Sequence, residues 1–514
     1  MIQLRDYQNV QLDFADDRLE VASTVAVESP TGSGKTYVML ELARRWLDRD
    51  ALSNVVISTG FNNLVFLMEK RALEMGLKPL VLIGTKALNC PMEWDAKNGD
   101  EAEFKPFTMD GSCRCGTKHY HLDVEHGDPS EKSCPFTMRE YRSLLEKISK
   151  GSGYVVITNH STYLAHQGLG TFSNCSLLMV DEAHTFSTFY DSWVSLELDR
   201  SDLAKIDQAI SHLRPPMNMI VKSNIMNGKQ LPQSQVEALV NEVRGKSKSL
   251  VRQFFETKPA ANNWIEMESD AYTINYFYRV FEMERPKTLL MSATMDDFTL
   301  QMFEVRHVNV YREHKSFCDY SQSEFIALPR EEFKPAYLEF LDYVNEKGLH
   351  RGLCLSTTIN DMRIALGCNG YNGFRMIDDL DEFSHADPGE KLVLCGSRAL
   401  FQGIDIPALD FVCLNRIPFP NWNDKARAQQ DYLTNNGKNG FDPWKGFVVP
   451  KTQNDILQSS GRLWRDVSSK GVVSIFDDRI EKHRYMIKRC FDQYRHGIAI
   501  NIRREPNGEI ESFI

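Results

Sequence analysis

Short apolar runs alternate with amphipathic segments along most of the chain, and this alternation predicts the order of strands and helices. In the first half, strands are expected at Thr24–Val27, Asn54–Gly60, Pro79–Gly84, Gly153–His160, Cys175–His184 and Lys287–Thr294. Helical patterns at 37–46 and 61–76 separate the first three of these runs. Strands that alternate with helices favour a parallel sheet, whose ligands gather at the carboxyl ends of the strands.

The pattern begins anew near Leu300. Strand-like runs follow at Gly352–Ser356, Lys391–Cys395, Asp410–Leu414 and Gly471–Phe476. Two segments interrupt the first half, a polar, turn-rich one at 86–139 and a mostly helical one at 201–263. We therefore expect an α/β protein with two parallel-sheet domains. Residues 1–85, 140–200 and 264–300 would form the first domain and 301–514 the second, with the two segments as insertions.

A glycine-rich loop joins the first expected strand to the first long helix. It consists of Ser29, Pro30, Thr31, Gly32, Ser33, Gly34, Lys35 and Thr36. Its glycines permit the tight turn that points consecutive N–H groups at phosphate oxygens. Lys35 is expected to reach the β- and γ-phosphates and the Thr36 hydroxyl to ligate Mg²⁺. The loop predicts nucleotide binding, although Ser29 stands where the pattern has glycine.

Two further polar groups fit a nucleotide site. Arg5 and Gln8 lie just upstream of the loop, where they would either grip the adenine edge or form a solvated helix start. The apolar run at 175–180 ends in Asp181 and Glu182. Beside a phosphate loop, Asp181 would hold the Mg²⁺ shell and Glu182 would orient and deprotonate the attacking water.

A helical segment of the second domain carries Gln458, Arg462 and Arg465 on one face. Two arginines on one face suit a γ-phosphate presented across a domain cleft, and an exposed basic face is the alternative interpretation. The segment 396–405 resembles a loop that places Asp405 near the same cleft.

Composition adds a cellular context and a candidate metal site. The net charge of −10 argues against a globally basic nucleic-acid coat, but it allows a basic channel. No run reaches the length of a membrane span and no signal-peptide pattern opens the chain, so we expect a soluble, cytoplasmic protein without membrane partners. Four of the eleven cysteines, Cys90, Cys113, Cys115 and Cys134, fall in the irregular segment. They suggest a metal or cluster that holds this segment together, with zinc and nearby histidines as a competitor.

Taken in order, these segments resemble the motif set of superfamily 2 helicases, and specifically its XPD/DinG branch. The matching stretches are Pro30–Thr36, Thr59–Asn62, Thr158–His160, the Asp-Glu-Ala-His box at Asp181–His184, Ser292–Thr294, Gly396–Asp405 and Gln458–Arg465. Branch-specific details are Thr158-Asn-His160, Ile417-Pro-Phe-Pro420 and Asp477-Asp-Arg479.

This resemblance implies two RecA-like domains, an inserted [4Fe–4S] domain at 86–139 and a small helical arch domain at 201–263. The four cysteines would hold the cluster, although the Cys113-Arg-Cys115 spacing is closer than the family's usual middle pair. The DNA contacts it implies are Thr59, Phe61, Lys86, Asn159, His160 and Phe401. Gly403 and Asp405 would join the ATP site, and His184, Ser292 and Thr294 would couple it to the strand.

The implied function is an ATP- and Mg²⁺-dependent 5′→3′ DNA helicase, a monomer acting on single-stranded and forked duplex DNA in repair or replication. Its cell would be bacterial or phage-infected. Two alternatives remain open: a translocase that strips proteins or resolves R-loops, and a nucleotide-gated, redox-sensing binding module with little motor activity.

Overall fold

The computed structural model describes residues 4–30, 32–84, 135–194, 196–199, 263–268, 271–276, 281, 283, 285–312, 323–328, 332–397, 406, 408–420, 444, 448–464, 469–491, 499–502 and 511–512. Most of the segments expected to form the cluster domain and the arch domain, 86–134 and 201–262, lie outside these residues. Those two insertions therefore stay predictions.

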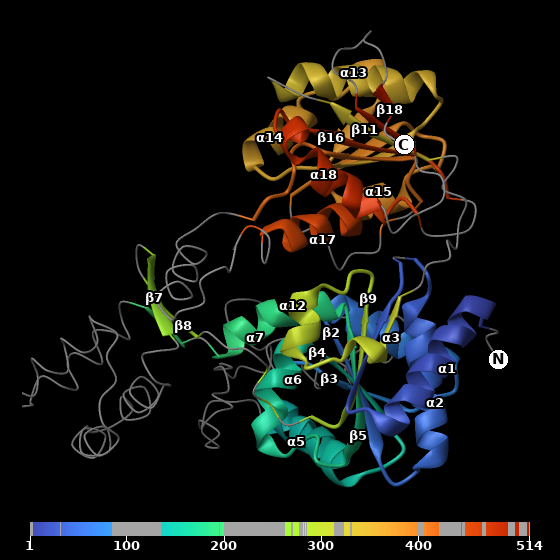
Figure 1. The fold of residues 1–514 in the computed structure, drawn as a ribbon, viewed down its shortest axis with the longest axis vertical. Helices are drawn as coiled ribbons and strands as arrows, with labels where there is room; N and C mark the ends of the chain where they lie inside the picture. Colours follow the sequence, from blue (N-terminus) through green and yellow to red (C-terminus); the bar gives the residue numbers. More distant parts are fainter. Residues whose placement is uncertain are drawn as a thin grey trace, which may run out of the picture.

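The first domain is a parallel α/β sheet with helices on both faces (Figure 1). Its strands are β1 (Thr24–Glu28), β2 (Asn54–Thr59), β3 (Pro79–Leu82), β4 (Val155–Asn159), β5 (Cys175–Asp181), β9 (Lys287–Ser292) and β10 (Val310–Arg312). Within the described residues they form one seven-stranded sheet in the order β10-β1-β9-β5-β2-β4-β3. Its helices are α1 (Asp6–Val21), α2 (Lys35–Arg49), α3 (Asn62–Glu74), α5 (Pro135–Lys150), α6 (His160–His166), α7 (Phe186–Val194) and α12 (Asp297–Met302).

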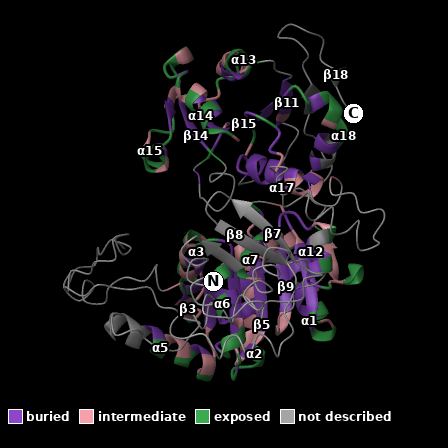
Figure 2. Ribbon diagram, turned by 90° about the vertical axis from the view of Figure 1, so that its left-hand side faces the viewer, coloured by how far each residue is buried: buried purple, intermediate pink, exposed green. Residues whose placement is uncertain are grey.

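The apolar runs of the sequence become the inner strands because both faces of this sheet are covered. Every residue of β2 is buried, and alternate side chains of the sheet enter two separate cores. Val55 and Ile57 face the core under α1, α2 and α3, whereas Val56 faces the core under α5, α6 and α7. The strong purple of the strands in Figure 2 reflects this two-sided burial.

The second domain repeats this architecture. Its strands are β11 (Glu324–Leu328), β12 (Arg351–Leu355), β13 (Arg375–Ile377), β14 (Leu392–Gly396), β15 (Phe411–Leu414), β16 (Val472–Phe476), β17 (Ala499–Ile502) and β18 (Glu511–Ser512). Their order is β13-β14-β12-β15-β16-β11-β17-β18, parallel except for the edge pair β17–β18. The helices are α13 (Phe333–Glu346), α14 (Ile359–Leu366), α15 (Leu380–His385), α17 (Val449–Ser460) and α18 (Ile480–Phe491). The prediction of two parallel-sheet, RecA-like domains is thus confirmed.

One sheet was not expected from the sequence. Strands β6 (Leu196–Asp199), β7 (Asn263–Glu268) and β8 (Ala271–Tyr276) form a small antiparallel sheet in the order β6-β8-β7. Its central strand, β8, lies beside α7, and β6 and β7 flank the segment 200–262, which is outside the described residues.

A row of three thiols crosses the middle of the second sheet. Cys354 of β12 pairs in register with Cys395 of β14 on one side and with Cys413 of β15 on the other. All three are fully buried, and they pack in one core with Tyr337 and Phe340 of α13.

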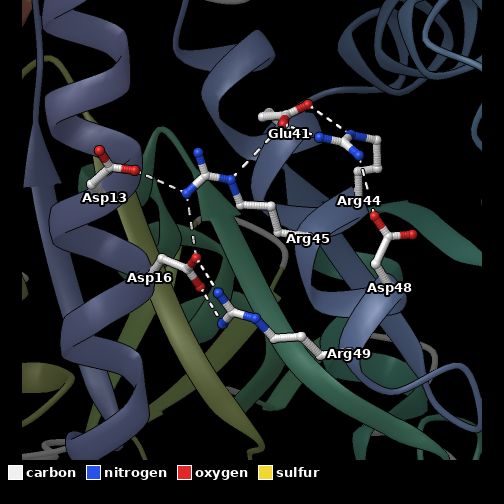
Figure 3. Close-up of polar contacts among 7 residues, drawn as sticks. All are labelled: Asp13, Asp16, Glu41, Arg44, Arg45, Asp48 and Arg49. Carbon is white, nitrogen blue, oxygen red and sulfur yellow. Dashed lines mark hydrogen bonds and ion pairs between the residues drawn. The ribbon is translucent and has the colours of Figure 1, made fainter.

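Helices α1 and α2 are joined by a ladder of charges (Figure 3). The buried Asp16 carboxylate accepts two parallel hydrogen bonds from Arg49, at 2.7 and 2.6 Å, and a longer one of 3.4 Å from Arg45. Arg45 also bonds Asp13 at 2.9 Å. Because α1 supports the phosphate loop and α2 continues from it, this ladder fixes the two helices that flank the loop.

Among the described residues, no helix combines the length and the apolar character that crossing a bilayer would require.

Candidate functional site

The glycine-rich loop connects β1 to α2 at the carboxyl edge of the first sheet. Gly32 and Gly34 have φ angles of 77° and 81°, a left-handed conformation that favours glycine. The Ser29 N–H donates to the Ser292 carbonyl of β9 at 2.9 Å, which anchors the start of the loop. The loop therefore turns tightly at the N-terminus of α2, which is the geometry of a phosphate-binding site. Thr31 lies outside the described residues.

Helix α1 supports the loop through hydrogen bonds from three of its side chains. Gln8 donates from Nε2 to the Ser33 carbonyl at 2.8 Å and accepts the Arg5 N–H at 2.8 Å. Tyr7 donates its hydroxyl proton to the same carbonyl at 2.8 Å, and Gln11 donates to Ser29 Oγ at 3.0 Å. In this structure Gln8 thus binds the loop itself, a role that the sequence interpretation of an adenine clamp did not include.

The serine at the first loop position is part of this support. Ser29 Oγ lies 2.7 Å from Ser33 Oγ, so a hydrogen bond closes the base of the loop. Ser29 is fully buried. The departure from glycine therefore adds a bond to the loop, where a glycine would offer none.

Lys35 lies between the loop and the acidic pair. Its Nζ donates to the carbonyls of Ser29 and Pro30 at 3.3 and 3.4 Å, and it lies 3.8 Å from Glu182 Oε1. Only 8% of Lys35 is exposed. Thr36 follows in the first turn of α2.

The acidic pair ends β5, as expected. Burial, followed by the neighbouring charge of Glu182, raises the pKa of Asp181 to about 7, while Lys35 lowers it. Two carboxylates beside one lysine leave an excess of negative charge that a divalent cation fits. Glu182 has a φ angle of 48°, uncommon for a residue with a side chain, and its N–H donates to Asp181 Oδ1 at 3.0 Å.

His184 links the acidic pair to the end of β9. Its Nδ1 lies 2.7 Å from Ser292 Oγ and 3.5 Å from Glu182 Oε2. Ser292 Oγ also accepts the Thr294 N–H at 3.1 Å. Burial lowers the pKa of His184, so the ring is neutral near pH 7. His184, Ser292 and Thr294 were expected to couple the ATP site to the DNA strand, and the structure brings the three residues together.

Helix α17 lies on the side of the second domain that faces the first domain (Figure 1), and one of its side chains contacts the acidic pair. Gln458 Nε2 donates to Glu182 Oε2 at 3.3 Å. Gln458 and Arg462 are 8% and 6% exposed, so neither lies on a solvated basic face. Arg465, Phe401, Gly403 and Asp405 lie outside the described residues.

The residues expected to touch DNA divide into two groups. Thr59 and His160 are fully buried, so neither side chain reaches a surface where a strand could lie. His160 Nδ1 bonds Ser58 Oγ at 2.7 Å, and burial lowers its pKa to about 3. In this structure both side chains lie inside the first domain, and their contact with DNA stays a prediction.

The other DNA candidates are accessible or lie outside the described part of the chain. Phe61 is 39% exposed and meets Phe189 edge-on, with ring centroids 6.1 Å apart. Asn159 caps α6 by accepting the Thr162 N–H at 2.7 Å and donates to Asn62 at 2.6 Å. Lys86 lies outside the described residues.

The predicted cluster ligands, Cys90, Cys113, Cys115 and Cys134, are also outside the described residues. In the part of the chain that the structure describes, no group of three or more His, Cys, Asp or Glu side chains could hold a metal ion. The cysteines of that part are buried and form no disulfide bond: Cys175, Cys354, Cys368, Cys395, Cys413 and Cys490.

Sequence reasoning missed Tyr7, Gln11, Asp296 and Asn454, which contact the loop or cross the cleft. A helical spacing signal existed for Gln11, which lies three residues after Gln8 on one face of α1.

Comparisons with known proteins agree with this geometry. Residues 375–491 match the family model for the helicase C-terminal domain, and residues 1–207 match the model for the type III restriction enzyme, res subunit. Over 97 residues the chain is 38% identical to the ATP-dependent helicase DinG of Mycobacterium tuberculosis, covering 18% of this chain and 14% of that protein. Over 98 residues it is 32% identical to the ATP-dependent DNA helicase YoaA of Haemophilus influenzae, again covering 18% and 14%.

These matches span a small part of each relative, whereas the likeness in fold is extensive. A solved structure titled XPD helicase superposes with a TM-score of 0.56 at 15% identity, covering 97% of this chain and 100% of that chain.

Proposed function

Because the chain belongs to the XPD/DinG-like group of superfamily 2 helicases, we propose that it is an ATP-dependent DNA helicase or translocase moving 5′→3′ on single-stranded DNA. One observation carries this proposal. The Glu182 carboxylate is approached by Lys35 from the phosphate loop and by Gln458 from the other domain. A group contacted from both domains can make hydrolysis depend on how the domains lie together.

The proposed binding step uses the loop and its lysine. The N–H groups that follow Gly32 and Gly34 cradle the phosphates, and Lys35 exchanges its contacts with the loop carbonyls for the β- and γ-phosphate oxygens. Thr36 and Asp181 would hold Mg²⁺, which supplies Lewis-acid charge at the phosphates.

The proposed hydrolysis step uses groups from both domains. Glu182 takes a proton from the attacking water, while Gln458 holds its carboxylate in place. Arg462 and Arg465 neutralise the charge that develops on the γ-phosphate. Loss of the phosphate then relaxes the contact between α17 and the acidic pair, and the domains shift along the strand with Phe61 as a stacking face.

We also propose that Cys90, Cys113, Cys115 and Cys134 hold a [4Fe–4S] cluster in an inserted domain, followed by an arch domain at 201–263. The support is their confinement to one irregular segment and the burial of all the described cysteines elsewhere. Anaerobically purified protein should be brown, with absorbance at about 400 nm. A colourless, zinc-loaded protein would contradict the cluster and leave the motor proposal intact.

The decisive experiment measures ATPase rate with and without single-stranded DNA, using K35A as the catalytically silent control. We expect strong stimulation by DNA in the wild type and no turnover in K35A. Partial duplexes with a 5′ or a 3′ tail then test the polarity, and forked and R-loop substrates test the preferred DNA. Turnover that is absent or independent of DNA would overturn the motor proposal and favour a nucleotide-gated binding module.

A further inference from the structure

A second polar contact crosses the cleft beside the one at Glu182. Asn454 lies one helical turn before Gln458 on α17, so both side chains share a face. Asn454 Nδ2 donates to Asp296 Oδ2 at 3.3 Å, the same length as the bond from Gln458 to Glu182. Asn454 is 9% exposed. Two consecutive turns of α17 therefore contact the first domain.

Asp296 is held rigidly where it meets Asn454. Its other carboxylate oxygen, Oδ1, accepts the Thr299 N–H at 2.6 Å and caps the N-terminus of α12. Asp296 lies four residues beyond Ser292, whose hydroxyl forms a hydrogen bond with His184. Rotating the carboxylate away from Asn454 would break the cap, so Asp296 presents a fixed acceptor to the second domain.

We propose that Asp296 and Asn454 form a positioning pair that sets α17 over the acidic pair, so that Gln458 and Arg462 arrive in register. Neither residue belongs to the sequence motifs of the site, and both act through α17. The inference rests on the proposed function, because it specifies how the second domain is aligned for hydrolysis. A purely stabilising contact is the competing explanation.

A charge exchange distinguishes the two explanations. Asn454→Asp places a second carboxylate against Asp296, and the like charges repel each other. Asp296→Asn keeps Oδ1 as the helix cap, and its new amide can donate to a carboxylate at position 454. The double variant D296N/N454D therefore restores one hydrogen bond with the donor and acceptor exchanged.

For DNA-stimulated ATPase, we expect N454D to lower kcat about ten-fold while KM for ATP changes less than about two-fold. KM should change little because the phosphate loop lies wholly in the first domain. In contrast, kcat should fall because domain closure brings α17 to the acidic pair. D296N alone should stay near wild type, since the amide of Asn454 can turn its oxygen toward the new donor. The double variant should regain most of the lost kcat, at an unchanged unfolding temperature.

A control variant tests for a mere charge effect. Asn345→Asp also adds one negative charge to the second domain, but on α13, which lies on the side away from the first domain (Figure 1). Its Oδ1 already accepts from Lys391 at 2.6 Å, so the new charge is compensated. N345D should leave kcat unchanged.

Hydrogen exchange in α17 supplies a readout that needs no activity. Peptides covering 448–461 should exchange faster in N454D than in the wild type, and the double variant should reverse this. A double variant no better than N454D in kcat and exchange, or an N454D protein equal to wild type, would overturn the inference. If the wild type shows no DNA-stimulated turnover, the proposed function fails, and the exchange data alone decide whether the pair positions α17.

Discussion

Substituting Gly34 by alanine should damage the phosphate loop for two separable reasons. Gly34 has a φ angle of 81°, and a Cβ there would lie 2.4 Å from Gln8 Nε2. The left-handed conformation costs an alanine about 1–2 kcal/mol. Because the clash is with the end of a flexible side chain, Gln8 would move and lose its bond to the Ser33 carbonyl, worth about 0.5–1.5 kcal/mol.

The sum, about 1.5–3.5 kcal/mol, corresponds to a loss of nucleotide affinity of roughly 10- to 300-fold if it falls on the binding-competent loop. Equilibrium titration with a fluorescent ATP analogue in Mg²⁺ would measure it. Gln8→Ala alone should cost only the hydrogen bond, about five-fold on the same scale.

The double variant Q8A/G34A gives the sharper result. Since G34A has already lost the Gln8 bond, removing Gln8 as well should add almost nothing. Gly76→Ala is the matched control, because Gly76 has a φ angle of 75° and no atom within 4 Å of the added Cβ. It should cost stability without changing nucleotide affinity. Additive losses in Q8A/G34A would refute this account of the loop.

Three further results follow from contacts already described. Glu182→Gln should retain ATP binding but lower the ATPase rate by about 10²- to 10⁴-fold, because the amide cannot accept the proton of water; equal losses in binding and turnover would contradict this. In urea unfolding, Asp16→Asn should lower the free energy of unfolding by about 1–2 kcal/mol, because it removes one acceptor of the parallel bonds from the half-exposed Arg49. The control Glu20→Gln should change the free energy of unfolding by less than about 0.5 kcal/mol, because Glu20 is exposed and lies 3.9 Å from Arg49. His160 is held neutral by burial, which lowers its pKa from 6.5 to about 3, so its contribution to stability is present above pH 6.5 and is lost as the pH falls toward 3. By pH 5.5 the free energy of unfolding of the wild type should have fallen by about 1.4 kcal/mol through His160, a loss that H160N should not show. Parallel pH profiles of the two proteins would exclude this explanation.

Much of the fold could be predicted because parallel strands buried on both faces leave an unmistakable apolar run. Asn54–Thr59 and Cys175–Asp181 are such runs, and they are inner strands of the first sheet. Edge and short strands carry less signal. Arg375–Ile377 has only three residues, and Ala499–Ile502 pairs near the sheet edge, so neither was expected.

The site divides in the same way. Lys35, Asp181 and Glu182 could be brought together from the sequence because the carboxyl ends of parallel strands meet at one edge. The Asn454–Asp296 bond could not, since its partners lie 158 positions apart and a polar helical residue carries no mark of its partner. The burial of Thr59 and His160 was also missed, because a polar residue at a strand end reads as exposed until the covering helix is known.

The row formed by Cys354, Cys395 and Cys413 offers a natural reporter. Because these thiols are fully buried in the core that α13 helps to cover, a thiol-specific reagent can reach them only when that core opens. The rate at which they react therefore measures how often the interior of the second domain opens to solvent, and no engineered label is needed. Adding nucleotide and DNA would change that rate if the proposed ATPase cycle opens the interior of the domain, and would leave it unchanged if the domain moves as a rigid body.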